Sequence, residues 1–88
     1  MVALSFNPLE SVKKLVQRWF EYYKEMGDEM AVEMFFDDLE IVEHYVRALF
    51  DQGVIDGDEY WRFLNYCEEL LEELKKIAGI ERIDMRFW

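Results

Sequence analysis

Three stretches of the chain repeat an apolar residue every three or four positions, and a glycine stands just beyond each stretch. This spacing places the apolar side chains on one side of an α-helix. The repeating positions are Leu9, Val12, Val16, Trp19, Tyr23 and Met26, then Val32, Phe35, Leu39, Val42, Val46 and Leu49, and finally Tyr60, Phe63, Cys67, Leu70, Leu74 and Ile77. The pattern therefore predicts three helices that each turn one face toward a shared core.

Capping residues set the bounds of these helices at about 8–26, 29–52 and 57–78. Asp28 and Asp56 each precede a helical stretch, where a short acidic side chain can accept hydrogen bonds from free backbone N–H groups. The connections are short, which favours antiparallel neighbours. We therefore expect a mainly α protein, a three-helix antiparallel bundle, with all 88 residues in a single domain.

The two ends of the chain have a different periodicity. Apolar residues alternate over about 2–6 and again over about 82–87, which is the spacing of β-strands. A two-stranded ribbon alone is only marginally stable in water. We therefore expect short terminal strands that pair within the chain, pack on the bundle, or pair across a dimer or with a partner's strand.

Acidic side chains outnumber basic ones by 20 to 10, which gives the chain a net charge of −10. Such a surface opposes direct binding to nucleic acid, because phosphates attract basic side chains. No apolar run reaches the roughly 20 residues that cross a bilayer, and the first residues lack the layout of a signal peptide. The sequence therefore predicts a small, acidic, cytoplasmic protein that binds no membrane. Its few amide side chains would also suit a thermophilic source.

The chain contains one cysteine and one histidine. Cys67 belongs to a predicted inner face, where burial raises a thiol's pKa and suppresses its reactivity. His44 follows Glu40 by one helical turn, but both lie on a predicted outer face and no second histidine completes a metal site. We therefore expect no cofactor, no metal and no enzymatic activity.

The sequence holds more large apolar side chains than three inner faces can bury, because a domain of this size buries only about 60–65% of its unfolded surface. Aromatic residues and methionines left on a surface are typical of protein interfaces. Either the terminal strands cover this surplus, or it binds a second copy or another protein. The residues that we expect to contact such a partner are Met34, Ile41, Tyr45, Trp61 and Trp88.

The predicted second helix has an acidic outer side. Glu33, Asp37 and Glu40 follow one another along it, and we expect Asp38 and Glu43 to widen it. Carboxylates one turn apart are spaced by about 5–6 Å, comparable with phosphates along a nucleic-acid strand. This side is either a solvated surface or a surface that imitates nucleic acid.

Two functions follow from these surfaces. The apolar surplus predicts a non-enzymatic protein–protein interaction module, an accessory or regulatory subunit that works as a homodimer or bound to a protein partner. In charge and size alone, the chain also resembles the small acidic proteins that inhibit restriction or CRISPR defences. That resemblance implies an inhibitor that blocks the basic groove of a nucleic-acid-binding protein.

Overall fold

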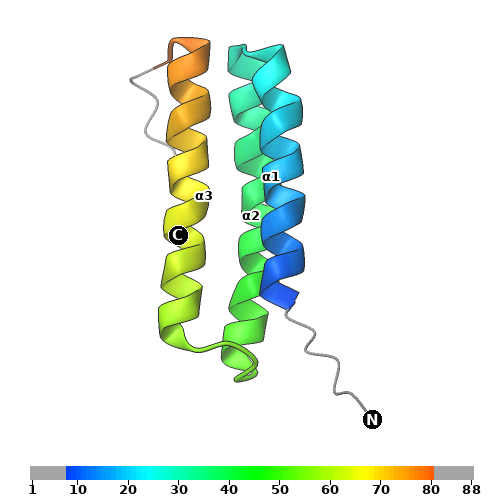
Figure 1. Cartoon of the computed structure of the whole chain (residues 1–88), viewed down its shortest axis with the longest axis vertical. Coiled ribbons are helices and arrows are strands. Elements are labelled where there is room, and N and C mark those ends of the chain that lie inside the picture. The colour runs from blue at the N-terminus through cyan, green and yellow to red at the C-terminus, as the bar shows by residue number, and fades with distance from the viewer. Residues whose placement is uncertain (1–7, 81–88) are drawn as a thin grey trace.

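The fold was taken from a computed structural model that describes residues 8–80. Three α-helices follow one another: α1 (Pro8–Met26), α2 (Glu29–Asp51) and α3 (Gly57–Ala78). Figure 1 shows that α1 and α3 run in one direction and α2 in the other. Each helix packs against both of the others. The predicted antiparallel three-helix bundle is therefore confirmed, and each helix begins and ends within one residue of its predicted bounds.

The predicted strands at 2–6 and 82–87 lie outside the described residues, and so does Trp88. Within residues 8–80 the chain forms helices and their connections, without a strand. None of the helices in this range is long and apolar enough to span a membrane. The assignment of the whole chain to a single domain stays a prediction.

The starts of α2 and α3 are each capped by an aspartate. The Asp28 carboxylate accepts a hydrogen bond from the Ala31 backbone N–H at 2.8 Å. Asp56 forms a reciprocal capping box with Glu59, with bonds of 2.8 and 3.1 Å. A cap of this kind contributes about 1 kcal/mol to stability. Between α1 and α2, Gly27 adopts a left-handed φ of 62°, which a side chain would strain.

The core lies where the three helices meet. Phe35 of α2 and Phe63 of α3 are fully buried. The Phe35 ring lies 6.1 Å from that of Phe20 and 5.8 Å from that of Tyr23, both on α1. These aromatic contacts fix α1 against α2 near the Gly27 turn, because paired rings add to the apolar area that they bury.

The sequence-based prediction of which side chains are buried was wrong at a few positions on these helices. Met26 and Ile77, expected in the core, are 39% and 43% exposed. Phe20, Leu64 and Leu71, expected in the surplus, are buried. The reason is geometric: in a three-helix bundle each helix contacts two neighbours, so two adjacent apolar stripes are covered and the ends of a single stripe can reach solvent.

Candidate protein-binding face

A shallow groove of about 330 Å³ follows the outer side of the seam between α1 and α2. It is lined by Pro8, Ser11, Val12, Leu15, Trp19, Ile41, Val42 and Tyr45. Leu15, Ile41 and Tyr45 are 42%, 67% and 49% exposed, so their apolar atoms face solvent. The groove is thus an open apolar site and not part of the closed core.

The same surface continues along the seam toward the Gly27 turn. Tyr22 and Met26 follow Trp19 on α1 at a helical spacing of three and four residues, and Met30 and Met34 precede Ile41 on α2. Residues at these spacings share one side of a helix. All four are exposed. We name this surface the α1/α2 apolar face, made of Leu15, Trp19, Tyr22, Met26, Met30, Met34, Ile41 and Tyr45.

A hydrogen bond between side chains joins α1 to α2 within this seam. The Tyr23 hydroxyl donates a hydrogen bond to Asp38 Oδ2 at 2.6 Å. Burial, and then the adjacent Asp38 carboxylate, raise the pKa of Tyr23 to about 12. Asp38 is half-buried and turned toward α1. The expectation that it widens the acidic outer side of α2 is therefore wrong.

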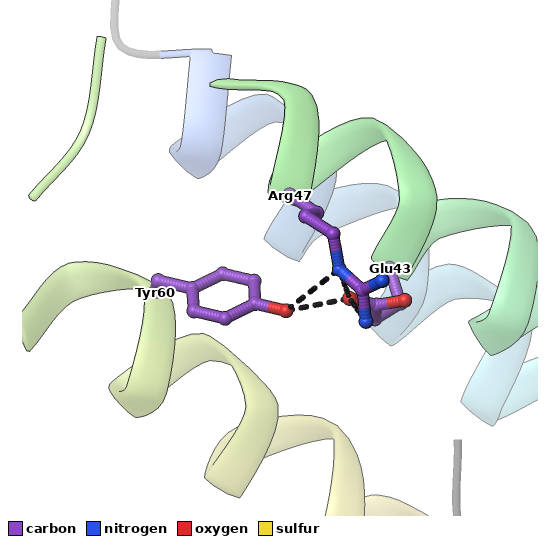
Figure 2. Close-up of polar contacts among 3 residues, drawn as sticks. All are labelled: Glu43, Arg47 and Tyr60. Carbon is purple, nitrogen blue, oxygen red and sulfur yellow. Dashed lines mark hydrogen bonds and ion pairs between the residues drawn. The ribbon is translucent and has the colours of Figure 1, made fainter. Parts of the chain in front are cut away.

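Glu43 lies on the opposite side of α2, in the seam with α3. Figure 2 shows Tyr60 of α3 pointing toward Glu43 and Arg47 of α2. Glu43 Oε2 accepts hydrogen bonds from the Tyr60 hydroxyl at 2.6 Å and from Arg47 Nε at 2.9 Å. Arg47 Nη2 also lies 2.9 Å from that oxygen, which completes an ion pair. Burial and the Glu43 carboxylate raise the pKa of Tyr60.

The prediction that Glu43 belongs to the acidic outer side is wrong, because its side chain is only 2% exposed. A buried carboxylate is tolerated only when partners satisfy its charge and its lone pairs. Tyr60 and Arg47 supply those partners. Glu43 thus fastens α2 to α3 and is not available to a ligand.

The acidic outer side of α2 is reduced to Glu33, Asp37 and Glu40, all exposed and followed by the exposed His44. We name these three carboxylates the acidic ridge. Within residues 8–80 none of them forms an ion pair. No group of three His, Cys, Asp or Glu side chains in this range is arranged to hold a metal ion.

The structure separates Trp61 from the other predicted contact residues. Met34, Ile41 and Tyr45 share the α1/α2 apolar face, whereas Trp61 lies on α3 with its ring 6.0 Å from that of Tyr60. It is 55% exposed. Trp61 therefore lies beside Tyr60 on α3 and does not line the groove.

Cys67 is fully buried, in the place that its spacing predicted. Burial raises the pKa of its thiol to about 12, although the positive charge of Lys13 acts in the opposite direction. The side chain consequently stays a neutral thiol inside the core.

The sequence analysis did not predict the part of the apolar face that lies on α1. Trp19 and Met26 were assigned to the core, and Leu15 was counted only as surplus. A signal was present, because Leu15 and Tyr22 stand three or four residues from Trp19 or Met26 and so widen the predicted inner stripe on one side. The apolar side of α1 is therefore wider than contact with two neighbouring helices covers, and Leu15, Tyr22 and Met26 stay exposed.

Comparisons with protein-family models, with curated proteins and with solved structures find no match to this chain. The function is therefore inferred from the surfaces themselves.

Proposed function

We propose that this protein is a non-enzymatic protein–protein interaction module, an accessory or regulatory subunit that binds its partner through the α1/α2 apolar face. One observation carries the proposal: seven large apolar side chains, each 39–67% exposed, gather along one seam of the bundle. An exposed apolar patch of several hundred Å² on a small protein marks an interaction surface.

The residue types on this face also favour binding. Three methionines adapt to the shape of a partner, because their side chains are unbranched and flexible. Tyr45 and Trp19, at the groove, are of the types that contribute most to binding energy at interfaces. A groove between two helices is also the shape that receives an apolar stripe of a further helix.

The titratable groups support a role without catalysis. Glu43 is occupied by Tyr60 and Arg47, and Cys67 is a buried neutral thiol. A nucleophile or general base needs access to a substrate and a pKa suited to proton transfer. A lone buried thiol also suits a reducing compartment, so we propose that the protein works in the cytoplasm.

A photo-crosslinking amino acid placed at residue 41 or at residue 44, in the cells that naturally make the protein, tests this proposal. Ile41 is on the apolar face, whereas His44 is on the acidic side of the same helix. We expect residue 41 to give a covalent adduct with a protein and residue 44 to give none. Adducts from residue 44 alone, or none from either position, would contradict the proposal.

A second candidate function rests on the acidic ridge. Glu33, Asp37 and Glu40 are exposed and form no ion pair within residues 8–80, so their charge is free to attract a basic groove. On this alternative the protein imitates nucleic acid and inhibits a nucleic-acid-binding protein. Adducts from residue 44 would favour it, as would binding that weakens steeply with salt and is lost when the three carboxylates become amides.

A further inference from the structure

The seam between α1 and α2 has two sides, and a helix already packs along one of them. On the inner side α3 contacts both helices and buries an apolar stripe that includes Phe63 and Leu71. On the outer side the groove and the rest of the apolar face follow α1 from Pro8 to Met26, which is about 27 Å at 1.5 Å per residue. An apolar surface of this length along two helices fits one further helix that turns an apolar stripe toward it.

Carboxylates stand along the α2 margin of this face. Asp38 accepts a hydrogen bond from Tyr23 of α1, so it marks the side of α2 that is turned toward α1. Successive residues lie about 100° apart around a helix. The order around α2, moving away from α1, is therefore Asp38, then Met34 and Ile41, then Asp37 and Glu33. Asp37 and Glu33 are exposed and form no ion pair within residues 8–80, so this margin of the face is negative.

The margin on α1 changes sign along its length. Toward the Gly27 turn, the exposed Glu25 follows Tyr22 of the apolar face by three residues. Toward the opposite end, the exposed Arg18 follows Leu15 of the face by the same spacing. Residues three apart are neighbours on a helix surface. The α1 margin is thus acidic near the turn and basic away from it.

The negative charge of the face is therefore concentrated at the end near the Gly27 turn, on both margins. Residues 20–40 contain eight acids and one base, Lys24. Lys24 is paired with Glu21 at 3.5 Å, and its ammonium lies 5.6 Å from the centre of the Phe20 ring. The other end, residues 8–19 together with 41–51, contains four Lys or Arg and three acids. Bases from outside the described residues can therefore complement the acidic end.

We propose that the occupant of the α1/α2 apolar face is an amphipathic helix of a partner protein, whose apolar stripe is flanked by Lys or Arg at the end that lies near the Gly27 turn. This inference rests on the proposed function, because it names the kind of partner that binds the same face. The helix packs along the seam on the side opposite α3. Its bases reach Glu25 on one margin and Glu33 and Asp37 on the other.

The same charges disfavour other occupants. A second copy of the chain would bring the same acidic margins and a further net charge of −10. An anionic lipid surface would be repelled for the same reason. The basic groove of a nucleic-acid-binding protein would pair with the acidic ridge but leave the apolar side chains in water. A helix that is both apolar and basic complements the whole face.

Synthetic peptides of about 18 residues, which as helices match the length of the face, test the proposal. In the first peptide leucines recur every three or four positions, lysines fill the polar positions of one half, and glutamines fill those of the other half. The second peptide has glutamate in place of each lysine. The third contains the residues of the first in an order that spreads the leucines around the helix. We expect the first peptide to bind one-to-one with micromolar affinity, measured by fluorescence anisotropy, and the other two to bind at least about 100-fold more weakly.

Two matched double variants separate local charge from net charge. Glu33→Gln with Asp37→Asn removes two exposed carboxylates from the margin of the face. Glu69→Gln with Glu73→Gln removes two exposed carboxylates at the same spacing from α3, which does not line the groove. We expect the first variant to bind the lysine peptide about 10-fold more weakly, and the second to stay within about twofold of the unsubstituted protein. Ile41→Ser should weaken binding about 10-fold, because it removes apolar contact.

Circular dichroism should show that every variant is helical. Failure of the lysine peptide to bind, or equal binding of the lysine and glutamate peptides, would overturn the basic helix as occupant. Equal losses in the two double variants would also overturn it, since they would show a general attraction between charges. Unchanged binding in Ile41→Ser would overturn it as well, because the peptide would then contact the acids alone.

The adduct from residue 41 distinguishes failure of this inference from failure of the proposed function. A partner that is cross-linked through a basic amphipathic segment would support both. A partner cross-linked through a segment without bases, or a second copy of the chain, would overturn the basic helix and still support the proposed function.

Discussion

The two sides of α2 meet their neighbours in different ways. Toward α3, the seam is closed by a buried carboxylate whose charge and hydrogen bonds are satisfied by Tyr60 and Arg47. Toward α1, the contact at the Gly27 end includes one tyrosine–aspartate bond, and the outer part of the seam is an open apolar groove. In the α2/α3 seam a charged residue, Glu43, is buried, whereas in the outer α1/α2 seam apolar residues are exposed.

This contrast separates stability from binding. A buried, fully partnered charge favours one packing of α2 on α3, because moving the helices apart would leave the carboxylate buried without its partners. Exposed apolar side chains do not fix how the helices pack, and they expose the protein to aggregation. We therefore expect substitutions in the α2/α3 seam to change the free energy of unfolding, and substitutions in the outer α1/α2 seam to change association.

The largest expected effect on stability comes from Glu43→Ala. It leaves the buried Tyr60 hydroxyl without its acceptor at 2.6 Å and removes the partner of Arg47. We expect the free energy of unfolding, measured in urea, to fall by about 3 kcal/mol. Glu43→Gln keeps a carbonyl oxygen for Tyr60 and should cost about half as much.

The matched control for Glu43 is Glu40→Ala, one turn earlier on the same helix and exposed. It should change stability by less than about 0.5 kcal/mol. If Glu43→Ala were equally mild, the carboxylate would not fasten α2 to α3, and the contrast between the two seams would fail.

A smaller loss is expected from Tyr23→Phe, which removes the hydrogen bond to Asp38 and leaves the ring in place. Stability at neutral pH should fall by about 1 kcal/mol. The pKa of Tyr23 is raised from 10.0 to about 12, so its neutral form contributes stability that is complete below pH 10 and is lost as pH rises through 12.

Thermal unfolding followed from pH 8 upward checks this linkage. Tyr23→Phe should show a shallower alkaline loss than the unsubstituted protein, and part of the loss should remain because the Cys67 pKa is raised in the same direction. Identical pH profiles for the two proteins would show that the Tyr23 hydroxyl does not stabilise the α1/α2 contact.

The smallest effect on stability should come from Ile41→Ser, because that side chain is 67% exposed in the outer seam. We expect a change below about 0.5 kcal/mol when the protein is dilute enough to be monomeric. The same substitution should lower the yield of the covalent adduct formed when the photo-crosslinking amino acid is placed beside it on the apolar face, at residue 45. A loss of more than about 1.5 kcal/mol in the monomer would mean that this face is covered within the chain.

The bundle and its bounds could be predicted from the sequence because caps and apolar spacing are local signals. Asp28, Gly27 and Asp56 each act on the backbone within a few residues, and so they fix where helices begin and end. The position of Glu43 could not be predicted in this way. Its partner Tyr60 is 17 residues away, on another helix.

A hint about Glu43 was nevertheless present in the sequence. It follows Leu39 by four residues and precedes Val46 by three, which is the spacing of the buried stripe itself. Glu43 was nevertheless assigned to the outer side of the helix, because glutamates usually face solvent. The α1 half of the apolar face was missed for a different reason. Apolar spacing shows which side of a helix is apolar, but not how much of that side the neighbouring helices cover.

The buried thiol of Cys67 has a practical consequence for measuring motion in this protein. A thiol reagent can reach the sulfur only when the helices separate, because the side chain is fully enclosed in the closed bundle. With a single cysteine in the chain, every labelling event reports that one opening. The rate at which Cys67 is labelled therefore measures how often the core opens. A partner that holds α1 against α2 would lower that labelling rate without contacting the sulfur.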